Sequence, residues 1–239
     1  MIDLHTHILP KMDDGASSSD LSLEMLRMEA EQGVDTVVLT PHFYREKEDP
    51  SFFLQRRASS FYRLKDRISE LSDKEKERLP ELFLGAEVAW VPNMDEWSEL
   101  SQLCLGDSSF LLLELPFYPW SSKMIDQIYD LMSKTGITPI IAHLERYMKG
   151  QRWSNIQEIL ALGVPIQLSS GIFLTMGGRR LAKQLLHHGT GFLLASDCHN
   201  TTTRPPNLRD SLVILEKKFP AAAVQDLQRQ ARSIKQQLV

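Results

Sequence analysis

The sequence is poor in cysteine: Cys104 and Cys198 are the two thiols among 239 residues, and no Cys-x-x-Cys element is present. This argues against a disulfide framework and favours a reducing compartment. No apolar run approaches the ~20 residues that a membrane span needs, and no basic segment followed by an apolar one marks a signal peptide. The net charge of -4 gives no sign of a nucleic-acid partner. These absences predict a cytoplasmic protein without membrane insertion.

Short apolar runs alternate with helix-periodic segments along the whole chain. Seven runs have the length and composition of strands, at residues 1–7, 34–41, 82–87, 110–114, 138–143, 164–170 and 191–199. Helical periodicity occupies residues 19–32, 49–79, 94–104, 123–135, 154–162, 179–188, 208–218 and 221–238. Strands that alternate with helices imply a parallel sheet. We expect an α/β protein with one domain over residues 1–239, a distorted (β/α)7 TIM-like barrel with its chemistry at the C-terminal face of the strands.

Metal-capable side chains stand at the tips of six of these runs. His5 and His7 are two residues apart on one strand, so both imidazoles point to the same side. His187 and His188 instead end a helix, where a cation suits the helix dipole, and they are left out. The candidate ligands are then His5, His7, Asp14, His42, Glu87, Glu114, His143, Asp197 and His199.

Nine candidate ligands are too many for one metal ion and suit two or three. Imidazole and carboxylate groups without thiolate suit manganese, iron or zinc. Such a cluster lowers the pKa of a bridging water and clamps the oxygens of a phosphoryl group.

The motifs IDLHTHILPKMDDG, TPHFY, GAEV, LLLELPF, IAHLERY and ASDCHN follow one another along the chain. In this combination they resemble the PHP superfamily (polymerase and histidinol phosphatase). More narrowly they resemble its bacterial tyrosine-phosphatase branch, which acts on the autokinases of capsule and exopolysaccharide synthesis. The resemblance implies three divalent metal ions. Their ligands would be His5, His7, Glu87 and Asp197 for one, Glu87, Glu114 and His143 for a second, and Asp14, His42 and His199 for a third.

The resemblance also implies which residues handle the phosphate. Arg146 of HLERY and Arg204 of TRPP match the positions of phosphate-binding arginines in the family, and a guanidinium fits a phosphate dianion through paired hydrogen bonds. With His42 and His199 as further catalytic candidates, we expect a protein-tyrosine phosphatase in which a metal-bridging hydroxide attacks phosphorus directly. Manganese is the favoured metal, with iron or zinc as alternatives. The expected partner is the tyrosine-phosphorylated tail of a bacterial tyrosine autokinase, and a homo-oligomer is left open.

Some individual assignments stay open. Either Asp13 or Asp14 could be the ligand, and the neighbouring glycine favours Asp14. Arg45 follows His42 closely and could reach the substrate, whereas Glu145 is either a partner of the site or a solvated charge. Aromatic residues that could flank a substrate ring are Phe43, Tyr44, Phe117, Tyr118, Trp120 and Tyr147.

Other chemistries remain as alternatives. Cys198 and Arg204 have the spacing of cysteine-dependent tyrosine phosphatases, but the loop between them contains no glycine to let backbone N–H groups cradle phosphate. A small-molecule phosphatase of the histidinol-phosphate type is the nearest alternative. An amidohydrolase is disfavoured because the fourth strand offers Glu114 and no lysine. A metal-binding scaffold that docks a partner without catalysis is the alternative from a different class.

Overall fold

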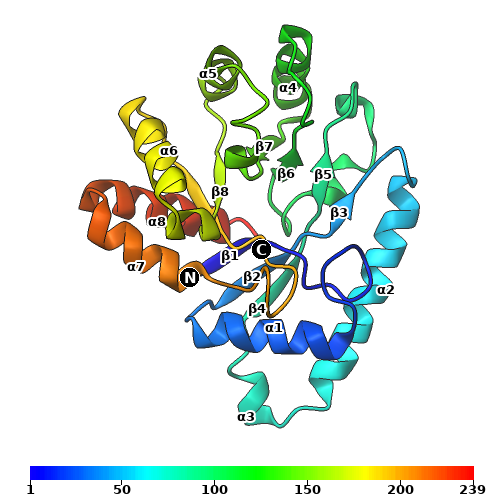
Figure 1. Ribbon diagram of the computed structural model, residues 1–239. Coiled ribbons are helices and arrows are strands. Elements are labelled where there is room, and N and C mark those ends of the chain that lie inside the picture. The colour runs from blue at the N-terminus through cyan, green and yellow to red at the C-terminus, as the bar shows by residue number, and fades with distance from the viewer.

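The computed structural model describes all residues 1–239, and every strand pairing in it is parallel. The expected α/β class is thereby confirmed. Figure 1 shows the strands at the centre and the helices around them. The strands are β1 (Ile2–Thr6), β2 (Thr36–Leu39), β3 (His42–Phe43), β4 (Glu81–Leu84), β5 (Glu87–Ala89), β6 (Phe110–Glu114), β7 (Thr138–Ile141), β8 (Gln167–Ser169) and β9 (Leu193–Ala195).

The α-helices agree with the expected periodic segments in most places. They are α1 (Ser19–Glu31), α2 (Pro50–Ser69), α3 (Asp73–Lys76), α4 (Ser122–Thr135), α5 (Trp153–Ala161), α6 (Met176–His187), α7 (Leu208–Lys218) and α8 (Ala221–Lys235). Short 3-10 helices are η1 (Met94–Glu96), η2 (Leu100–Leu103), η3 (Leu144–Arg146) and η4 (Ser170–Leu174). The start of α1 is fixed by Ser18, whose hydroxyl accepts a hydrogen bond from Leu21 N.

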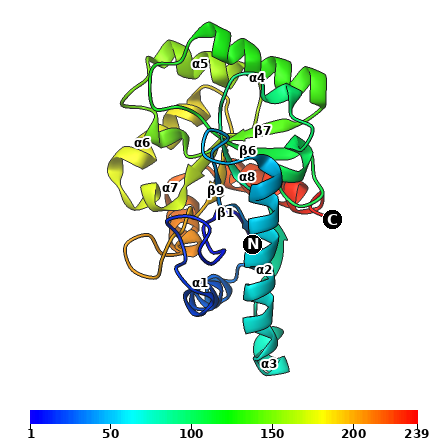
Figure 2. The same cartoon turned by 90° about the vertical axis from the view of Figure 1, so that its right-hand side faces the viewer.

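Two helical predictions were wrong in their extent. Residues 94–104 form the two short turns η1 and η2, because Trp97 between them is extended and places its ring edge-on against Phe43. The expected long helix over 49–79 ends at Ser69, and α3 begins separately after Ser72, which forms a capping box with Glu75. Figure 2 shows α2 running along one side of the molecule with α3 at its end.

The hydrogen-bonded ladders fall into three parallel sheets, in the orders β1-β2-β4, β3-β5-β6-β7 and β8-β9. The run expected at 34–41 forms β2, and a separate strand β3 follows after Thr40-Pro41. The run expected at 82–87 is divided between β4 and β5 at Gly85-Ala86. Proline has no N–H to donate, which interrupts the first of these ladders. Single bridges join the sheets, between Thr6 and Cys198 and between Ile141 and Ile166.

Two apolar clusters fill the space around the strands. The larger contains 47 buried residues, including residues from the helices that surround the strands. The smaller contains 11 buried residues and draws on all three sheets, with Leu4, Val38, Leu112, Ile140 and Leu193 among its members. Strands of all three sheets therefore pack around one apolar interior, which holds the ends of the strands in place relative to one another.

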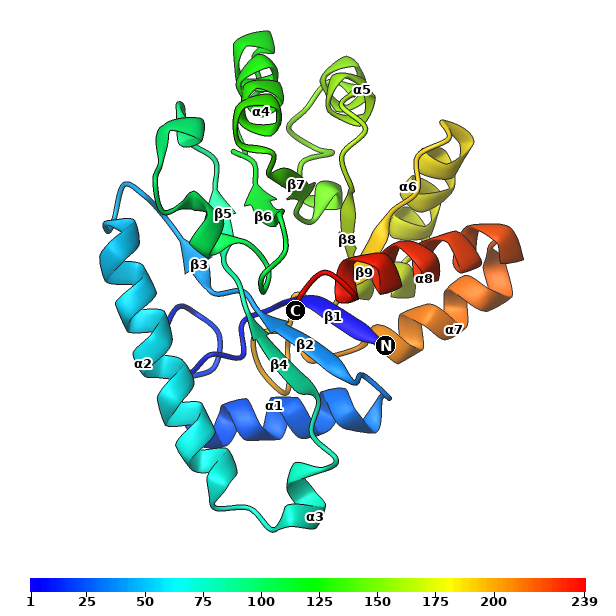
Figure 3. The same cartoon turned by 180° about the vertical axis from the view of Figure 1, so that it is seen from behind.

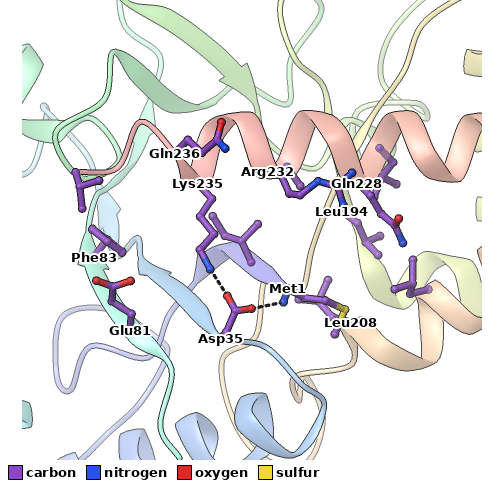
Figure 4. A pocket seen from close by; sticks show the side chains of 15 residues that line it. Met1, Asp35, Glu81, Phe83, Leu194, Leu208, Gln228, Arg232, Lys235 and Gln236 are labelled. Carbon is purple, nitrogen blue, oxygen red and sulfur yellow. Dashed lines mark hydrogen bonds and ion pairs between the residues drawn. The ribbon is translucent and has the colours of Figure 1, made fainter. Parts of the chain in front are cut away.

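A cavity of about 600 Å³ lies beneath α8, against residues that begin β1 and β4. Figure 4 shows the Lys235 side chain crossing from α8 to Asp35, which also accepts a hydrogen bond from the Met1 amine at 2.8 Å. Apolar side chains such as Phe83 and Leu194 line most of its wall. Figure 3 shows α8 from this side of the molecule. No helix is both long and apolar enough to cross a membrane.

Candidate metal centre

The first strand brings His5 and His7 together at its C-terminal end. Both side chains are fully buried, and their Nε2 atoms are 3.1 Å apart, as alternation along a strand predicts. Two carboxylate oxygens lie close to these Nε2 atoms. Glu87 Oε2 is 3.2 Å from that of His5 and 3.3 Å from that of His7, and Asp197 Oδ1 is 3.5 Å from each. The four residues expected to hold one ion therefore converge on one point.

Glu87 begins β5 and lies at the centre of the cluster. Its Oε1 is 2.7 Å from His143 Nε2, and its Oε2 is 2.9 Å from His42 Nδ1. Glu114, at the end of β6, places Oε1 at 3.5 Å from His143 Nε2. Although burial favours the neutral ring, hydrogen bonds to Glu114 and Glu87 raise the pKa of His143 to about 9. The Glu87 and Glu114 carboxylates thus favour a positive charge next to His143.

The outer part of the cluster contains Asp14, His42 and His199. Asp14 Oδ1 lies 3.4 Å from His199 Nε2 and 3.7 Å from His42 Nε2. The Asp14 side chain is 67% exposed, so this part of the cluster faces the solvent. The loop that carries Asp14 can fold back only because residue 15 is glycine: a Cβ there would overlap the carbonyl oxygen and Cβ of His7.

Asp13 has a different position from Asp14. Its Oδ2 accepts from His7 Nδ1 at 2.7 Å and from His42 N at 2.9 Å, and its Oδ1 accepts from Gly15 N at 2.9 Å. Burial would lower the pKa of His7, but the Asp13 carboxylate raises it well above its usual value. Both carboxylate oxygens of Asp13 are therefore engaged in hydrogen bonds, and Asp13 orients His7. Asp14 is the aspartate whose oxygen lies next to His199 and His42.

Several buried polar atoms of the cluster lack a hydrogen-bond partner: Glu87 Oε2, His42 Nδ1, His143 Nδ1 and His199 Nε2. The 2.9 Å approach of His42 Nδ1 to Glu87 Oε2 does not have hydrogen-bond geometry. Unsatisfied buried polar atoms are costly, so their convergence calls for a ligand. Burial and the adjacent His7 ring lower the pKa of His199 to about 4, and a neutral imidazole is the form that binds metals.

The candidate ligands form three overlapping groups. Within each group the potential ligand atoms all lie within 4.8 Å of one another, as the ligands of a single ion would. The groups are His7, Asp14, His42 and His199, then His5, His7 and Glu87, and lastly His42, Glu87 and Glu114. Nitrogen and carboxylate donors at these separations fit divalent cations of the first transition row. Relative to the expected ligand sets, His7 and His42 are each shared between two groups. Asp197 and His143, expected for the first and second ions, belong to none of the three groups.

Two strand-end residues of the cluster have unusual backbones. His143 and Asp197 are not glycine, yet both adopt positive φ angles, of 31° and 54°. Such conformations are sparsely populated and persist where the surroundings impose them, often at functional sites. The side chains of both residues contact the cluster, His143 at Glu87 and Asp197 at His5.

The two expected phosphate-binding arginines lie beside the cluster. Arg146, at the end of η3, and Arg204 each donate through Nη2 to the Asp197 carboxylate, and the Arg204 hydrogen bond measures 2.8 Å. About a third of each arginine side chain is exposed. Both guanidinium groups are therefore within reach of the solvent and next to the candidate ligands.

Cys198 points away from the cluster. Its thiol donates to Glu29 Oε1 at 3.7 Å and is fully buried. Burial and the nearby Glu29 and Asp3 carboxyl groups raise the pKa of Cys198 well above its usual value. A thiol held in its protonated form cannot act as the nucleophile, and this disfavours the cysteine-dependent alternative.

The remaining open residues are also placed. Arg45 pairs with Asp49 at 3.4 Å and lies over the Trp97 ring, so it is engaged away from the cluster. Glu145 is not a solvated charge, since its carboxylate accepts from Ser169 N at 3.3 Å and ties η3 to β8.

The aromatic residues divide into two groups. Phe43, Trp120 and Tyr147 are buried in the core, so they are not available to a substrate ring. Phe117 and Tyr118 are 57% and 61% exposed. The Phe117 ring is nearly parallel to His143, with 6.4 Å between centroids, so an exposed aromatic side chain lies beside a candidate ligand. Tyr44 is partly buried and packs against His42, at 5.3 Å between centroids.

One residue near the cluster was missed by the sequence reasoning. The buried Gln167 side chain on β8 accepts from His143 N at 2.5 Å and lies 3.3 Å from His5 Nδ1. The available signal was an amide side chain between Ile166 and Leu168 in a run predicted to be a strand, since a buried amide needs specific partners.

The family model described as capsular polysaccharide synthesis, CpsB/CapC, matches residues 1–234. The chain belongs to this family. It is 31% identical over 232 residues to the tyrosine-protein phosphatase YwqE of Bacillus subtilis (strain 168), covering 92% of this chain and 85% of the relative. It is 29% identical over 241 residues to the tyrosine-protein phosphatase CpsB of Streptococcus pneumoniae, covering 95% of this chain and 94% of the relative.

A solved structure agrees with this membership. It comes from work on YwqE from Bacillus subtilis and CpsB from Streptococcus pneumoniae, described there as unique metal-dependent tyrosine phosphatases. The TM-score is 0.81 at 28% identity, over 100% of this chain and 94% of the other. The resemblance found in the sequence motifs is confirmed.

Proposed function

We propose that this chain is a metal-dependent protein-tyrosine phosphatase. The observation that carries the proposal is the convergence of seven imidazole and carboxylate residues whose donor atoms are close enough to share metal ions. His143 and Asp197 lie against this group, and two solvent-accessible arginines lie beside it. The names of its relatives, which are tyrosine-protein phosphatases, support the same activity. The reaction is the hydrolysis of a phosphate monoester.

We further propose that residues 1–239 form one domain and that its strands make a distorted (β/α)7 barrel. The two bridges between sheets and the apolar cluster shared by all three sheets support this arrangement. The divided runs β2–β3 and β4–β5 then count as one barrel strand each. In such barrels the functional residues lie at the C-terminal ends of the strands, where the cluster is found.

The cluster is proposed to hold three divalent ions, with manganese favoured over iron or zinc. The proposed ligands are those expected from the sequence: His5, His7, Asp14, His42, Glu87, Glu114, His143, Asp197 and His199. Bound ions would lower the pKa of a water molecule and offset the charge of the phosphoryl oxygens. Buried nitrogen and oxygen atoms without hydrogen-bond partners, and the mixture of imidazole and carboxylate ligands, support metal binding by the cluster.

The residues of the chain supply binding and proton transfer. Arg146 and Arg204 are proposed to exchange their contacts with Asp197 for the phosphate, because a guanidinium forms paired, charge-assisted hydrogen bonds with a dianion. His42 and His199, the catalytic candidates from the sequence, lie with exposed Asp14 on the outer side. As proposed ligands they would assist proton transfer to the leaving oxygen only through a water molecule held there.

The surroundings of the opening support an aryl phosphate as substrate. Phe117 and Tyr44 provide aromatic surface beside the candidate ligands. A tyrosine side chain also departs readily, because phenol has a pKa of ~10. The proposed protein substrate is the tyrosine-phosphorylated tail of a bacterial autokinase of capsule synthesis, in line with the family description. Two free cysteines support a location in the cytoplasm.

The test compares substrates on the same metal-loaded protein. Peptides that differ only in phosphotyrosine, phosphoserine or phosphothreonine are assayed with manganese, together with histidinol phosphate. We expect phosphotyrosine to be preferred by roughly tenfold or more in kcat/KM. Equal rates on the three peptides, or a preference for histidinol phosphate, would favour the small-molecule phosphatase instead.

A further inference from the structure

One buried amide oxygen connects two of the candidate ligands. Gln167 Oε1 accepts a hydrogen bond from the backbone N of His143 at 2.5 Å, and His5 Nδ1 lies 3.3 Å from the same oxygen. All three residues are fully buried, so no water shields these contacts. A carbonyl oxygen has two lone pairs, and here both are directed to candidate metal ligands.

Gln167 lies where regular backbone pairing between two sheets ends, so a side chain has to supply the next hydrogen bond. Sheets β3-β5-β6-β7 and β8-β9 are joined at this point by the single bridge between Ile141 and Ile166. Beyond the bridge the chain turns at His143, whose φ is 31°, and its N–H donates to the Gln167 side chain instead of a strand neighbour. The Gln167 side chain thus accepts the hydrogen bond that a neighbouring strand would otherwise accept from His143 N. The same oxygen also lies next to His5 at the end of β1.

The contacts fix the chemistry of the His5 ring. A backbone N–H can only donate, so the Gln167 atom facing His143 must be the oxygen and not the amide nitrogen. That oxygen can only accept from His5, which therefore carries its proton on Nδ1. The lone pair of His5 Nε2 is then directed into the cluster, where Glu87 Oε2 lies at 3.2 Å.

The other supported rings follow the same rule. His7 Nδ1 meets Asp13 at 2.7 Å, and His199 Nδ1 meets the Asp197 carbonyl oxygen at 3.0 Å. Metal-binding histidines commonly donate their second N–H to such acceptors, which sets the tautomer and the ring orientation.

We infer that Gln167 is a positioning residue of the metal centre: its amide oxygen holds His5 in the metal-binding tautomer and fixes the backbone turn at His143. The inference rests on the proposed function only in assuming that the cluster binds divalent metal. Gln167 need not touch substrate or metal. Its removal should weaken metal binding and alter the coordination geometry, because two ligands from different sheets lose their common support.

The test is metal titration of metal-free protein carrying Gln167→Leu, which keeps the approximate volume but removes the acceptor. We expect affinity for cobalt or manganese to fall roughly ten- to a hundredfold, and the visible absorption spectrum of the cobalt form to change. Gln167→Glu retains an acceptor oxygen and should recover affinity to within roughly tenfold of the unmodified protein. Leu168→Val, next along β8, is the matched control for altered packing and should leave affinity and spectrum unchanged.

Gln167→Asn covers the case in which the leucine variant does not fold, because its shorter side chain withdraws the oxygen while keeping the amide. Unchanged affinity and spectrum in the leucine or asparagine variant would overturn the inference, as would an equal loss in Leu168→Val. Hydrolysis of phosphotyrosine peptide is measured on the unmodified protein in parallel. Normal metal binding with the expected Gln167 effect, but without hydrolysis, would refute the proposed function and leave the inference standing.

Discussion

Charged side chains lie at both ends of the strands, but the two ends differ in whether the polar atoms of these side chains have hydrogen-bond partners. Under α8, Asp35 is paired with Lys235 and the Met1 amine, and the cavity of about 600 Å³ there is mostly apolar. At the C-terminal ends, Glu87 Oε2 and His199 Nε2 are buried without hydrogen-bond partners. The Asp35 carboxylate there has its partners within the chain and needs no ligand. Buried polar atoms without partners mark the end of the molecule where a ligand belongs.

The largest difference between the two ends should appear in activity. We expect His5→Ala and Asp197→Ala to lower kcat/KM on phosphotyrosine peptide by more than roughly a hundredfold, because even the outer partners of metal ligands are worth ten- to a hundredfold. Asp35→Ala, at the opposite end, should keep activity within about twofold, as expected for a residue outside the site. Steady-state kinetics with elemental analysis of bound metal provides the measurement. Comparable losses at both ends would remove the distinction.

The arginines should separate phosphate binding from metal binding. Charge-assisted hydrogen bonds contribute ~1.5–3 kcal/mol, so Arg146→Ala and Arg204→Ala should each lower kcat/KM by roughly ten- to a hundredfold. The metal content should not change. Kinetics identical to those of the unmodified protein in both variants would show that neither arginine contacts the phosphate.

A smaller effect is expected at Cys198, which lies next to the cluster in sequence but faces Glu29. Cys198→Ser should keep activity within about threefold, because its side chain lies on the opposite face of the strand end. Melting curves check that the variant is folded. An inactive serine variant with its metals still bound would bring the thiol mechanism back.

The smallest effect concerns the ion pairs under α8. Although burial would raise it, hydrogen bonds from Lys235 and the Met1 amine lower the pKa of Asp35 to about 2. A carboxylate with a lowered folded-state pKa stabilises the fold above its unfolded pKa of about 4, and this contribution disappears as pH falls through about 2. The Asp35 side chain is 59% exposed, so solvent screening limits the contribution to about 1 kcal/mol or less.

Melting temperatures of the unmodified protein and Asp35→Asn should therefore differ by a few degrees at most near pH 6. The difference should shrink between pH 4 and pH 2. A difference that grows on acidification would contradict the sign of the shift in the Asp35 pKa.

Much of the cluster could be predicted from the sequence because its positions follow from local rules. Alternation on a strand places His5 beside His7, and parallel strands bring their C-terminal ends to one side. The division of work between Asp13 and Asp14 required the turn at Gly15, whose closeness to His7 is a three-dimensional property. Adjacent aspartates look alike in sequence, and only their hydrogen-bond partners distinguish them.

The failures have a common cause in tertiary packing. Residues 94–104 have helical periodicity, but packing of the Trp97 ring against Phe43 accompanies an extended backbone. Trp120 and Tyr147 lie close to the strand tips in sequence yet belong to the core. Gln167 was overlooked because its importance lies in two contacts, one with His5 and one with the backbone of His143, across separate sheets.

The most direct test of the account is titration of metal-free protein with manganese, following bound metal by elemental analysis and hydrolysis of phosphotyrosine peptide in the same samples. We expect the metal-free protein to be inactive and activity to return as up to three ions bind per chain. Full activity in protein verified to contain no metal would contradict a metal-dependent reaction.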